Sequence, residues 1–166
     1  MSRPSNVHLM KFEEIYQQYA PGVFRLCMGY VNNYEQARDL TQETFIAVWR
    51  YLPSFRNESK LSTWIYRIAS NNCFTAVEKA KRFVLGDFPE NLAYEPDSSK
   101  EQQLQFLYKC ISELPETERV IISLVLEDVH QEEIASIVGL SYVNTRMKIH
   151  RIKEKLAKKF KNNGSF

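Results

Sequence analysis

The sequence has little of what a β-rich fold, a membrane span or a disulfide framework requires. Glycine and proline supply only 5 and 6 of the 166 residues, which leaves few turns for a sheet-rich chain. The longest apolar run, near 120–126, is broken by Ser123 and is too short to cross a bilayer. The three cysteines are widely spaced without a nearby His or Cys partner, and polar sequence follows Met1. We therefore expect a soluble intracellular protein with free thiols, no disulfide and no signal peptide.

Strong net charge and catalytic motifs are also lacking. The 22 Lys and Arg residues nearly balance the 20 Asp and Glu residues, so the net charge of +2 identifies no partner. There is no Ser/His/Asp set, no metal-ligand cluster and no glycine-rich phosphate loop, and His8, His130 and His150 stand apart from any such partners. The sequence thus predicts no enzyme activity, no metal and no cofactor. Its 44% of hydrophobic residues is still enough for a core.

Helical periodicity, in contrast, runs through almost the whole chain. It predicts helices over 10–19, 21–31, 34–52, 61–82, 102–114, 115–126, 130–138 and 142–160. Residues 84–103 lack this periodicity and carry five acids against Lys100, which favours a flexible linker, although an acidic surface loop has the same composition. We predict an all-α fold of two small helical domains, 1–83 and 103–166, joined by an acidic linker over 84–102.

The sharpest functional signal is the basic amphipathic helix near the C-terminus. Residues 146–161 sum to +7, and the opposite stripe is apolar: Tyr142, Thr145, Ile149, Ile152, Leu156 and Phe160. Gly139 suits the end of the preceding helix and Ser141 suits an N-cap, which together give a helix-turn-helix outline. Such a helix could lie on an anionic membrane or simply in solvent. The preceding helix and its glycine turn favour the major groove of DNA.

Two weaker surfaces lie on earlier helices. On the 61–82 helix, aromatic, polar and cationic side chains lie away from the apolar stripe: Tyr66, Arg67, Ser70, Asn71, Phe74, Lys79, Lys81 and Arg82. They suit unpaired bases, or else a second neighbouring helix packs against Tyr66 and Phe74. On the 34–52 helix, a mixed acidic and apolar stripe (Asp39, Gln42, Glu43, Ile46 and Arg50) faces away from an apolar set that includes Trp49. This stripe suits a protein partner, although many such stripes are only solvated.

Motifs on these three surfaces resemble the sigma-70 family of bacterial transcription initiation factors. Residues 39–45 with 47–50 resemble region 2.2, Phe55-Arg56 with 62–71 resembles regions 2.3 and 2.4, and 114–116, 132–135 and 149–153 resemble region 4. The length and the two-block layout are similar to the extracytoplasmic-function (ECF) branch, which keeps regions 2 and 4. The resemblance covers about 10–82 and 103–160.

This resemblance implies a promoter-directing factor with defined partners and no cofactor. Asp39, Gln42 and Glu43 would dock on the β′ clamp helices of core RNA polymerase. The β flap of the polymerase is a further expected partner of the chain. The melted −10 element would be held by Phe55, Arg56, Lys60, Tyr66, Arg67, Asn71, Lys81 and Arg82. The −35 element would be read by Asn144, Arg146, Met147, Lys148, His150 and Arg151. The family also implies promoter DNA and an anti-sigma factor as partners.

Two other functions compete with this interpretation. A free-standing helix-turn-helix regulator would bind DNA tightly without polymerase, and an all-helical adaptor would bind only protein. The chain also departs from the family at Arg38, where an acid is common, and at Met147, where serine is usual. The residues 142–145 replace a start of the recognition helix that more often has small residues.

Overall fold

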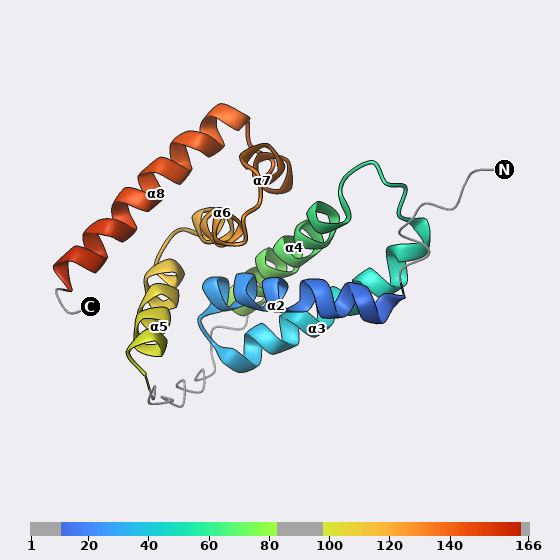
Figure 1. The fold of residues 1–166 in the computed structure, drawn as a ribbon, viewed down its shortest axis with the longest axis horizontal. Helices are drawn as coiled ribbons and strands as arrows, with labels where there is room; N and C mark the ends of the chain where they lie inside the picture. The colour runs from blue at the N-terminus through green and yellow to red at the C-terminus, as the bar shows by residue number, and fades with distance from the viewer. Residues whose placement is uncertain (1–10, 83–97, 164–166) are drawn as a thin grey trace.

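The structure is a computed structural model that describes residues 11–82 and 98–163, without the side chains of 80–82. All regular structure in these ranges is helical (Figure 1): α2 (Phe12–Val31), α3 (Tyr34–Tyr51), the 3-10 turn η1 (Leu52–Ser54), α4 (Leu61–Arg82), α5 (Ser99–Ser112), α6 (Glu116–Leu126), α7 (Gln131–Val138) and α8 (Tyr142–Asn162). The all-α prediction is confirmed. We call α2–α4 the N-terminal half and α5–α8 the C-terminal half.

Side-chain caps explain where α3 and α8 begin. Asn33 accepts a hydrogen bond from the Gln36 backbone N–H at 2.9 Å, and Ser141 accepts one from the Asn144 backbone N–H at 3.2 Å. Each bond satisfies an N–H that has no partner within its helix. Gly139 ends α7 with φ of 71°, a left-handed conformation that costs glycine little. The helix-turn-helix outline is therefore formed as predicted.

Two helix boundaries differ from the prediction by more than two residues. We expected a break before Pro21, but α2 continues through it from Phe12 to Val31. Pro21 removes one backbone hydrogen bond, and apolar burial on both sides of it, at Ile15, Val23 and Leu26, keeps the helix in place. The other difference is α5, which begins at Ser99 rather than at 102 because Ser98 caps it by accepting from the Glu101 N–H at 3.2 Å.

Apolar stripes of α4 and α8 face the core, and the stripe predicted for α8 is largely confirmed. Ile65, Ala69 and Cys73 of α4 have no exposed surface. In α8, the residues Thr145, Ile149, Ile152 and Leu156 are buried, and Phe160 packs edge-on against Phe106 of α5 at 4.9 Å between ring centroids. Tyr142 was wrongly placed in this stripe, because it lies in the first turn of α8, where no neighbouring helix covers it, and is 43% exposed.

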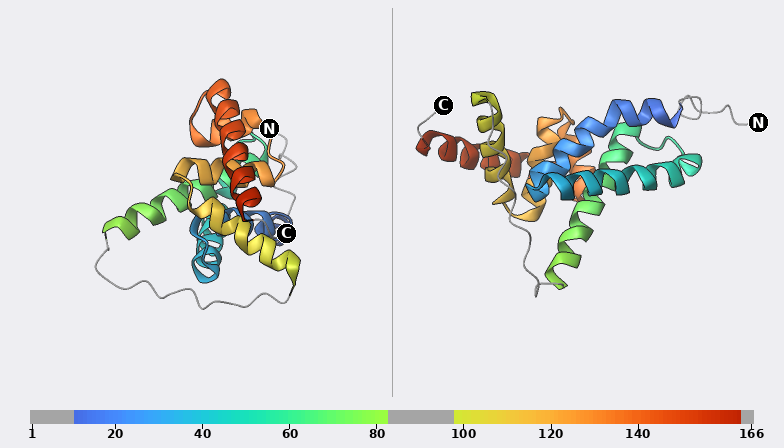
Figure 2. Two further views of the ribbon diagram at one scale, coloured as in Figure 1. Left: turned by 90° about the vertical axis from the view of Figure 1, so that its left-hand side faces the viewer. Right: turned by 90° about the horizontal axis from the view of Figure 1, so that it is seen from below.

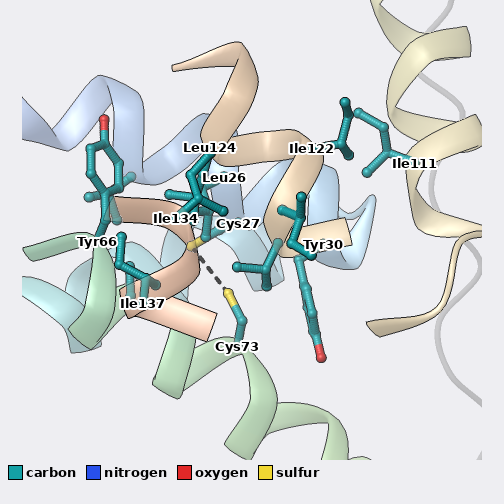
Figure 3. Packing of buried hydrophobic residues seen from close by; sticks show 14 of the residues in the cluster. Leu26, Cys27, Tyr30, Tyr66, Cys73, Ile111, Ile122, Leu124, Ile134 and Ile137 are labelled. Carbon is teal, nitrogen blue, oxygen red and sulfur yellow. Dashed lines mark hydrogen bonds between the residues drawn. The ribbon is translucent and has the colours of Figure 1, made fainter. Parts of the chain in front are cut away.

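The two halves pack against each other around one continuous hydrophobic core. Helix α2 contacts α5 and α6, and α4 contacts α6 and α7. Figure 3 shows Leu26 of α2 beside Leu124 of α6 and Ile134 of α7, and Tyr30 of α2 on the side of Ile122 of α6. Cys27 and Cys73 are buried thiols, and the Cys73 Sγ donates a hydrogen bond to the Cys27 Sγ at 3.9 Å. This hydrogen bond, together with burial, raises the pKa of Cys73.

Glycine permits the close approach of α2 and α6. A Cβ atom at Gly29 would lie 2.5 Å from Ser123 Oγ, and one at Gly22 would lie 2.9 Å from the Glu127 carboxylate. Because Gly22 and Gly29 are seven residues apart, they share one face of α2. Helix α8 lies at one end of the molecule, and α3 and the start of α2 extend toward the other (Figure 2).

Candidate nucleic-acid and polymerase interfaces

The outer face of α8 carries most of the side chains predicted to read DNA. Five of the six predicted −35 residues are exposed: Asn144, Arg146, Met147, His150 and Arg151; Lys148 is half-buried. They occupy the N-terminal part of the helix that follows the turn, which is the part that a helix-turn-helix presents to base edges. Within the described residues, Arg146, Lys148 and Arg151 form no ion pair, so their charges are available for phosphates or bases.

The C-terminal part of α8 uses two of its lysines internally, which the sequence did not indicate. Lys155 pairs with Glu118 of α6 at 3.0 Å, and Lys159 pairs with Glu113, the residue that follows α5. The hydrogen bond from Lys159 lowers the pKa of Glu113. These pairs attach α8 to its own half, so the DNA-binding charge is concentrated nearer the start of the helix.

The exposed face of α3 combines acids with large apolar side chains. Asp39, Gln42 and Glu43 are all exposed, as predicted for a docking face. Trp49 was expected in the buried set but is 65% exposed, and Ile46 is 59% exposed. In this part of α3, Phe45 and Val48 point into the core, and the Trp49 ring lies at the edge of the core.

Phe12 and Tyr16 of α2 extend this apolar face into a shallow groove of about 410 Å³, which Gln42, Phe45, Ile46 and Trp49 complete. The Phe12 and Trp49 rings meet edge-on at 5.1 Å. Large aromatic side chains beside a few polar groups are typical of interface anchors. We define this α3 face as Asp39, Gln42, Glu43, Ile46 and Trp49.

A second hollow lies beside the loop that precedes α4. Phe55 is buried against Trp64, with ring centroids 4.9 Å apart. With Tyr51, Arg56, Arg67 and others, these rings line a pocket of about 620 Å³ that also includes Ser136 of α7. Aromatic walls with a guanidinium at the rim suit an unstacked base and its phosphate. Asn71 is exposed further along α4, whereas the side chains of Lys81 and Arg82 lie outside the described residues.

Tyr66 does not have the exposed position that we expected for base stacking. It is 7% exposed, and its burial raises the pKa of its hydroxyl to about 12. Its ring points toward Gly22 of α2, and Glu127 lies beside it. Phe74 packs edge-on against Tyr30 at 5.9 Å. The alternative prediction, that Tyr66 and Phe74 pack against a second neighbour, is correct in this arrangement because α2 and the C-terminal half cover them.

Two of the predicted −10 cations are also in contact with the C-terminal half. Lys60 Nζ lies 2.6 Å from Glu133 Oε1, and Arg67 Nη2 donates to Ser136 Oγ at 2.7 Å. A third pair joins Arg25 of α2 to Glu127. Sequence reasoning missed Arg25, Glu127 and Glu133, because no local pattern shows a contact between residues about 70 to 100 positions apart.

Other kinds of site are not evident in the part of the chain that the structure describes. No group of three or more His, Cys, Asp or Glu side chains could hold a metal ion within residues 11–82 and 98–163. No helix in the same ranges is long and apolar enough to span a membrane. The candidate interfaces of the described residues are the α3 face, the pocket beside α4 and the outer face of α8.

Helical architecture with a helix-turn-helix at one end and an aromatic, cationic pocket beside α4 defines a DNA-binding transcription protein of two helical parts. The profile of sigma-70 region 2 matches residues 15–83, and that of sigma-70 region 4 matches residues 105–156. Together these matches span more than half of the chain, which belongs to the sigma-70 family and is an RNA polymerase sigma factor of the ECF type.

Curated relatives agree along nearly the whole chain. The ECF RNA polymerase sigma-E factor of Haemophilus influenzae is 32% identical over 169 residues, covering 89% of this chain and 86% of that protein. The ECF sigma factor SigM of Bacillus subtilis is 28% identical over 154 residues, covering 89% and 93%. The chain is thus a transcription initiation factor that confers promoter specificity.

Solved structures show the same fold in both halves. The sigma factor RpoE of Bartonella quintana, in complex with the anti-sigma factor NepR, matches with a TM-score of 0.79 at 23% identity, over 90% of this chain and 96% of that one. CnrH, in complex with the cytosolic domain of CnrY, matches with a TM-score of 0.70 at 19% identity, over 93% and 89%. These likenesses extend over both the N-terminal and the C-terminal half.

Proposed function

We propose that each of the three surfaces carries one step of promoter recognition. Region 2 occupies 1–83 and region 4 occupies 103–166, with 84–102 between them. The α3 face docks on the β′ clamp helices of core polymerase, the pocket beside α4 holds the −10 strand, and α8 reads the −35 element. The observation that supports this most is the order of the surfaces along the chain, because it coincides with the matched regions.

The α3 face supports polymerase docking through its chemistry. Ile46 and Trp49 offer apolar anchors, and Asp39 and Glu43 offer carboxylates to a cationic partner. Interfaces of this kind draw most of their affinity from a few large side chains and their orientation from charges at the rim. Arg38 lies beside this face and pairs only loosely with Glu35, at 3.7 Å. We infer that Arg38 meets an acidic group of the polymerase.

The two DNA surfaces differ in what they recognise. The pocket beside α4, with Phe55, Trp64 and Arg67, suits a single flipped base, and Arg56, Lys60 and Asn71 lie near enough in sequence to follow the strand. Helix α8 is suited to duplex DNA, because Arg146 and Arg151 can reach phosphates or guanine edges. Two surfaces that each bind weakly become effective when polymerase fixes the distance between them.

The remaining partner is a protein that inhibits the factor. Of the two structural relatives described above, RpoE was solved with the anti-sigma factor NepR bound and CnrH with the cytosolic domain of CnrY bound. We infer that this chain also has an anti-sigma partner. The chain needs no cofactor and no catalytic group for these roles, and it acts in the cytoplasm because the polymerase and the chromosome are there.

Run-off transcription tests the proposal directly. Core RNA polymerase is incubated with pooled genomic fragments from the source organism, with and without this protein. We expect discrete start sites that appear only with the protein. Sequence-specific gel shifts by the protein alone, without any transcripts, would instead favour the free-standing regulator, and silence in both assays would favour the adaptor.

A pair of charge-matched variants assigns the DNA role to the start of α8. Arg146→Ala with Arg151→Ala should abolish promoter selection while polymerase binding is unchanged. Lys158→Ala with Lys161→Ala removes the same charge from the end of the helix and should retain most transcription. Loss of polymerase binding in the first variant would contradict the assignment.

A further inference from the structure

The turn between α6 and α7, together with the first turn of α7, is acidic and lies on the cationic face of the N-terminal half. Glu127, Asp128, Glu132 and Glu133 give residues 127–133 four acids and no Lys or Arg. Two of these acids pair with the N-terminal half. Glu127 accepts two hydrogen bonds from Arg25, at 2.6 and 2.8 Å, and Glu133 pairs with Lys60 at 2.6 Å.

The contacts continue along the face that the proposed function gives to the −10 strand. Ser136 of α7 also lies at this face. Its Oγ accepts a hydrogen bond from Arg67, and the residue forms part of the wall of the pocket that contains Phe55 and Trp64. Tyr66 is buried beside Glu127. Three of the residues assigned to the −10 strand thus contact the C-terminal half. Tyr66 is buried beside it, whereas Lys60 and Arg67 are held by polar contacts, with the Lys60 side chain 64% exposed.

Apolar packing beneath these polar contacts holds the two halves together. Leu26 and Tyr30 of α2 are completely buried against the shared core (Figure 3), and Arg119 of α6 donates to the Tyr30 carbonyl at 3.1 Å. Gly22 and Gly29 allow the helices to approach within a distance that a Cβ atom would prevent. The two halves therefore meet in a closely packed interface.

We propose that residues 127–136 act as an intramolecular cover that takes the place of the −10 strand. The carboxylates of Glu127 and Glu133 occupy cations that phosphates would otherwise neutralise, and Ser136 closes one side of the base pocket. This inference rests on the proposed function, which assigns that face to DNA. The −10 strand binds only after the two halves separate.

The cover leaves the other two functional surfaces accessible. Ile46 and Trp49 on α3 are exposed, and Arg146 and Arg151 on α8 are exposed. The closed protein can therefore dock on polymerase before it opens, and its free form is prevented from binding single strands. When only a fraction of molecules is open, the apparent affinity for a strand falls by that fraction.

Trp64 provides a readout that is specific for the covered pocket. The chain has two tryptophans, Trp64 in the pocket and Trp49 on the α3 face. In a Trp49→Phe background, all tryptophan emission comes from Trp64, and a base that stacks nearby quenches it. The probe is a random-sequence single-stranded DNA of about 12 nucleotides, within the range that such sites bind. Among the residues that the structure describes, the pocket around Trp64 has no lining residue on α8, so this signal reports on the pocket.

Two double variants with the same charge change separate opening from a general charge effect. Glu127→Gln with Glu133→Gln removes both ionic contacts to the N-terminal half. Glu113→Gln with Glu118→Gln also removes two acids, but these pair with Lys159 and Lys155 inside the C-terminal half. We expect the first variant to bind the probe at least about threefold more tightly than the parent, and the second to bind as the parent does.

A reversible lock tests the same inference in the opposite direction. A Cβ atom at Gly29 would lie 3.7 Å from Ser123 Cβ, which is the usual Cβ separation in a disulfide. Gly29→Cys with Ser123→Cys should therefore form a cross-link when oxidised glutathione takes up two electrons and two protons from the thiols. Peptide mapping distinguishes this bond from one between Cys27 and Cys73, and the parent protein is treated in parallel.

The oxidised lock should bind the probe at least about tenfold more weakly than the same protein after reduction. Equal quenching by the locked, parent and opened proteins would overturn the inference, and so would absence of quenching in the opened variant. If the parent still directs run-off transcription in that case, the proposed function stands without the cover. If quenching follows our expectation but no transcripts form, the cover stands and the assignment as a promoter factor fails.

Discussion

Arg25 of α2 and Glu127 after α6 form a bidentate ion pair between the two halves, with Nε to Oε1 at 2.6 Å and Nη2 to Oε2 at 2.8 Å. The hydrogen bonds that Arg25 donates to Glu127 raise the pKa of Arg25 above its ordinary value. The side chain of Glu127 is only 9% exposed, whereas that of Arg25 is 52% exposed. The carboxylate therefore depends on Arg25 more than the guanidinium depends on Glu127.

Arg25→Ala should destabilise the closed protein because it leaves a largely buried carboxylate without its partner. Solvent screens the exposed side of the pair, so we expect a loss of about 1 kcal/mol in the free energy of unfolding. Urea denaturation measures it. Arg38→Ala is the control, because Arg38 and Glu35 are both exposed and 3.7 Å apart. An equal loss in both variants would contradict a special role for the Arg25–Glu127 pair.

Gly29→Ala should cost about 1–3 kcal/mol in stability, because its Cβ would meet Ser123 Oγ at 2.5 Å. Ser123→Ala alone should be nearly neutral, because its buried hydroxyl has no hydrogen-bond partner among the described residues. The double variant should recover part of the loss, since the nearest remaining atom of residue 123 is 3.7 Å away. A double-mutant cycle of unfolding free energies measures this coupling, and strictly additive costs would contradict it.

Local patterns in the sequence predicted what depends on local structure. The periodicity at Ile149, Ile152 and Leu156, the cap at Ser141 and the glycine turn at Gly139 were enough to place the helix-turn-helix correctly. These features rely on hydrogen bonds and burial within a few turns of helix. The family motifs added the order of the three surfaces.

The errors concern residues whose surroundings come from distant parts of the chain. Trp49 follows the apolar stripe of α3 closely enough to be taken for a core residue. In the fold its ring is largely exposed at the edge of the core, where it packs edge-on against Phe12 of α2. Tyr66 has the sequence pattern of an exposed aromatic residue, but α2 and Glu127 bury it. Pro21 would end an isolated helix, and packing on both sides carries α2 through it. Long-range packing decides each of these cases.

Trp49→Ala should weaken binding to core RNA polymerase by about tenfold or more without lowering thermal stability, because the side chain is 65% exposed and is the largest apolar group of the α3 face. Leu104→Ala on α5 removes another half-exposed apolar side chain and should leave this affinity unchanged. Fluorescence anisotropy of labelled protein titrated with core polymerase measures the affinity. Unchanged binding by Trp49→Ala would place the docking surface elsewhere.

Tyr66 should make stability fall in alkaline solution. Burial raises its pKa to about 12, from the value of 10.0 that is usual for a tyrosine. The folded state therefore retains the phenol proton at pH values where the unfolded state has released it. The stabilising effect of the neutral phenol is complete below pH 10 and is lost as the pH rises from there toward 12.

Denaturation at several pH values checks this effect. Tyr66→Phe should flatten the decline in stability above pH 10, whereas Tyr34→Phe, at an exposed position, should leave it as in the parent. Tyr30 and Tyr108 also have raised pKa values because they are buried, so part of the decline should remain in Tyr66→Phe. An unchanged slope in that variant would mean that the hydroxyl of Tyr66 is accessible to solvent in the folded protein.

Asn144 and Lys148, both near the start of α8, should contribute differently to duplex binding. An amide can bond two atoms of one base edge, so Asn144→Ala should relax the sequence preference at one position of the −35 element by about 1–3 kcal/mol. An ammonium acts mainly as a charge, so Lys148→Ala should weaken binding to all sequences alike and reduce the slope of log affinity against log salt by about 1. Selection of bound sequences from a randomised −35 library, with salt titrations of the holoenzyme on one selected promoter, separates the two effects. If Asn144→Ala instead lowers the salt slope and keeps the preference, its amide contacts phosphate, and the base contact must come from another residue of α8.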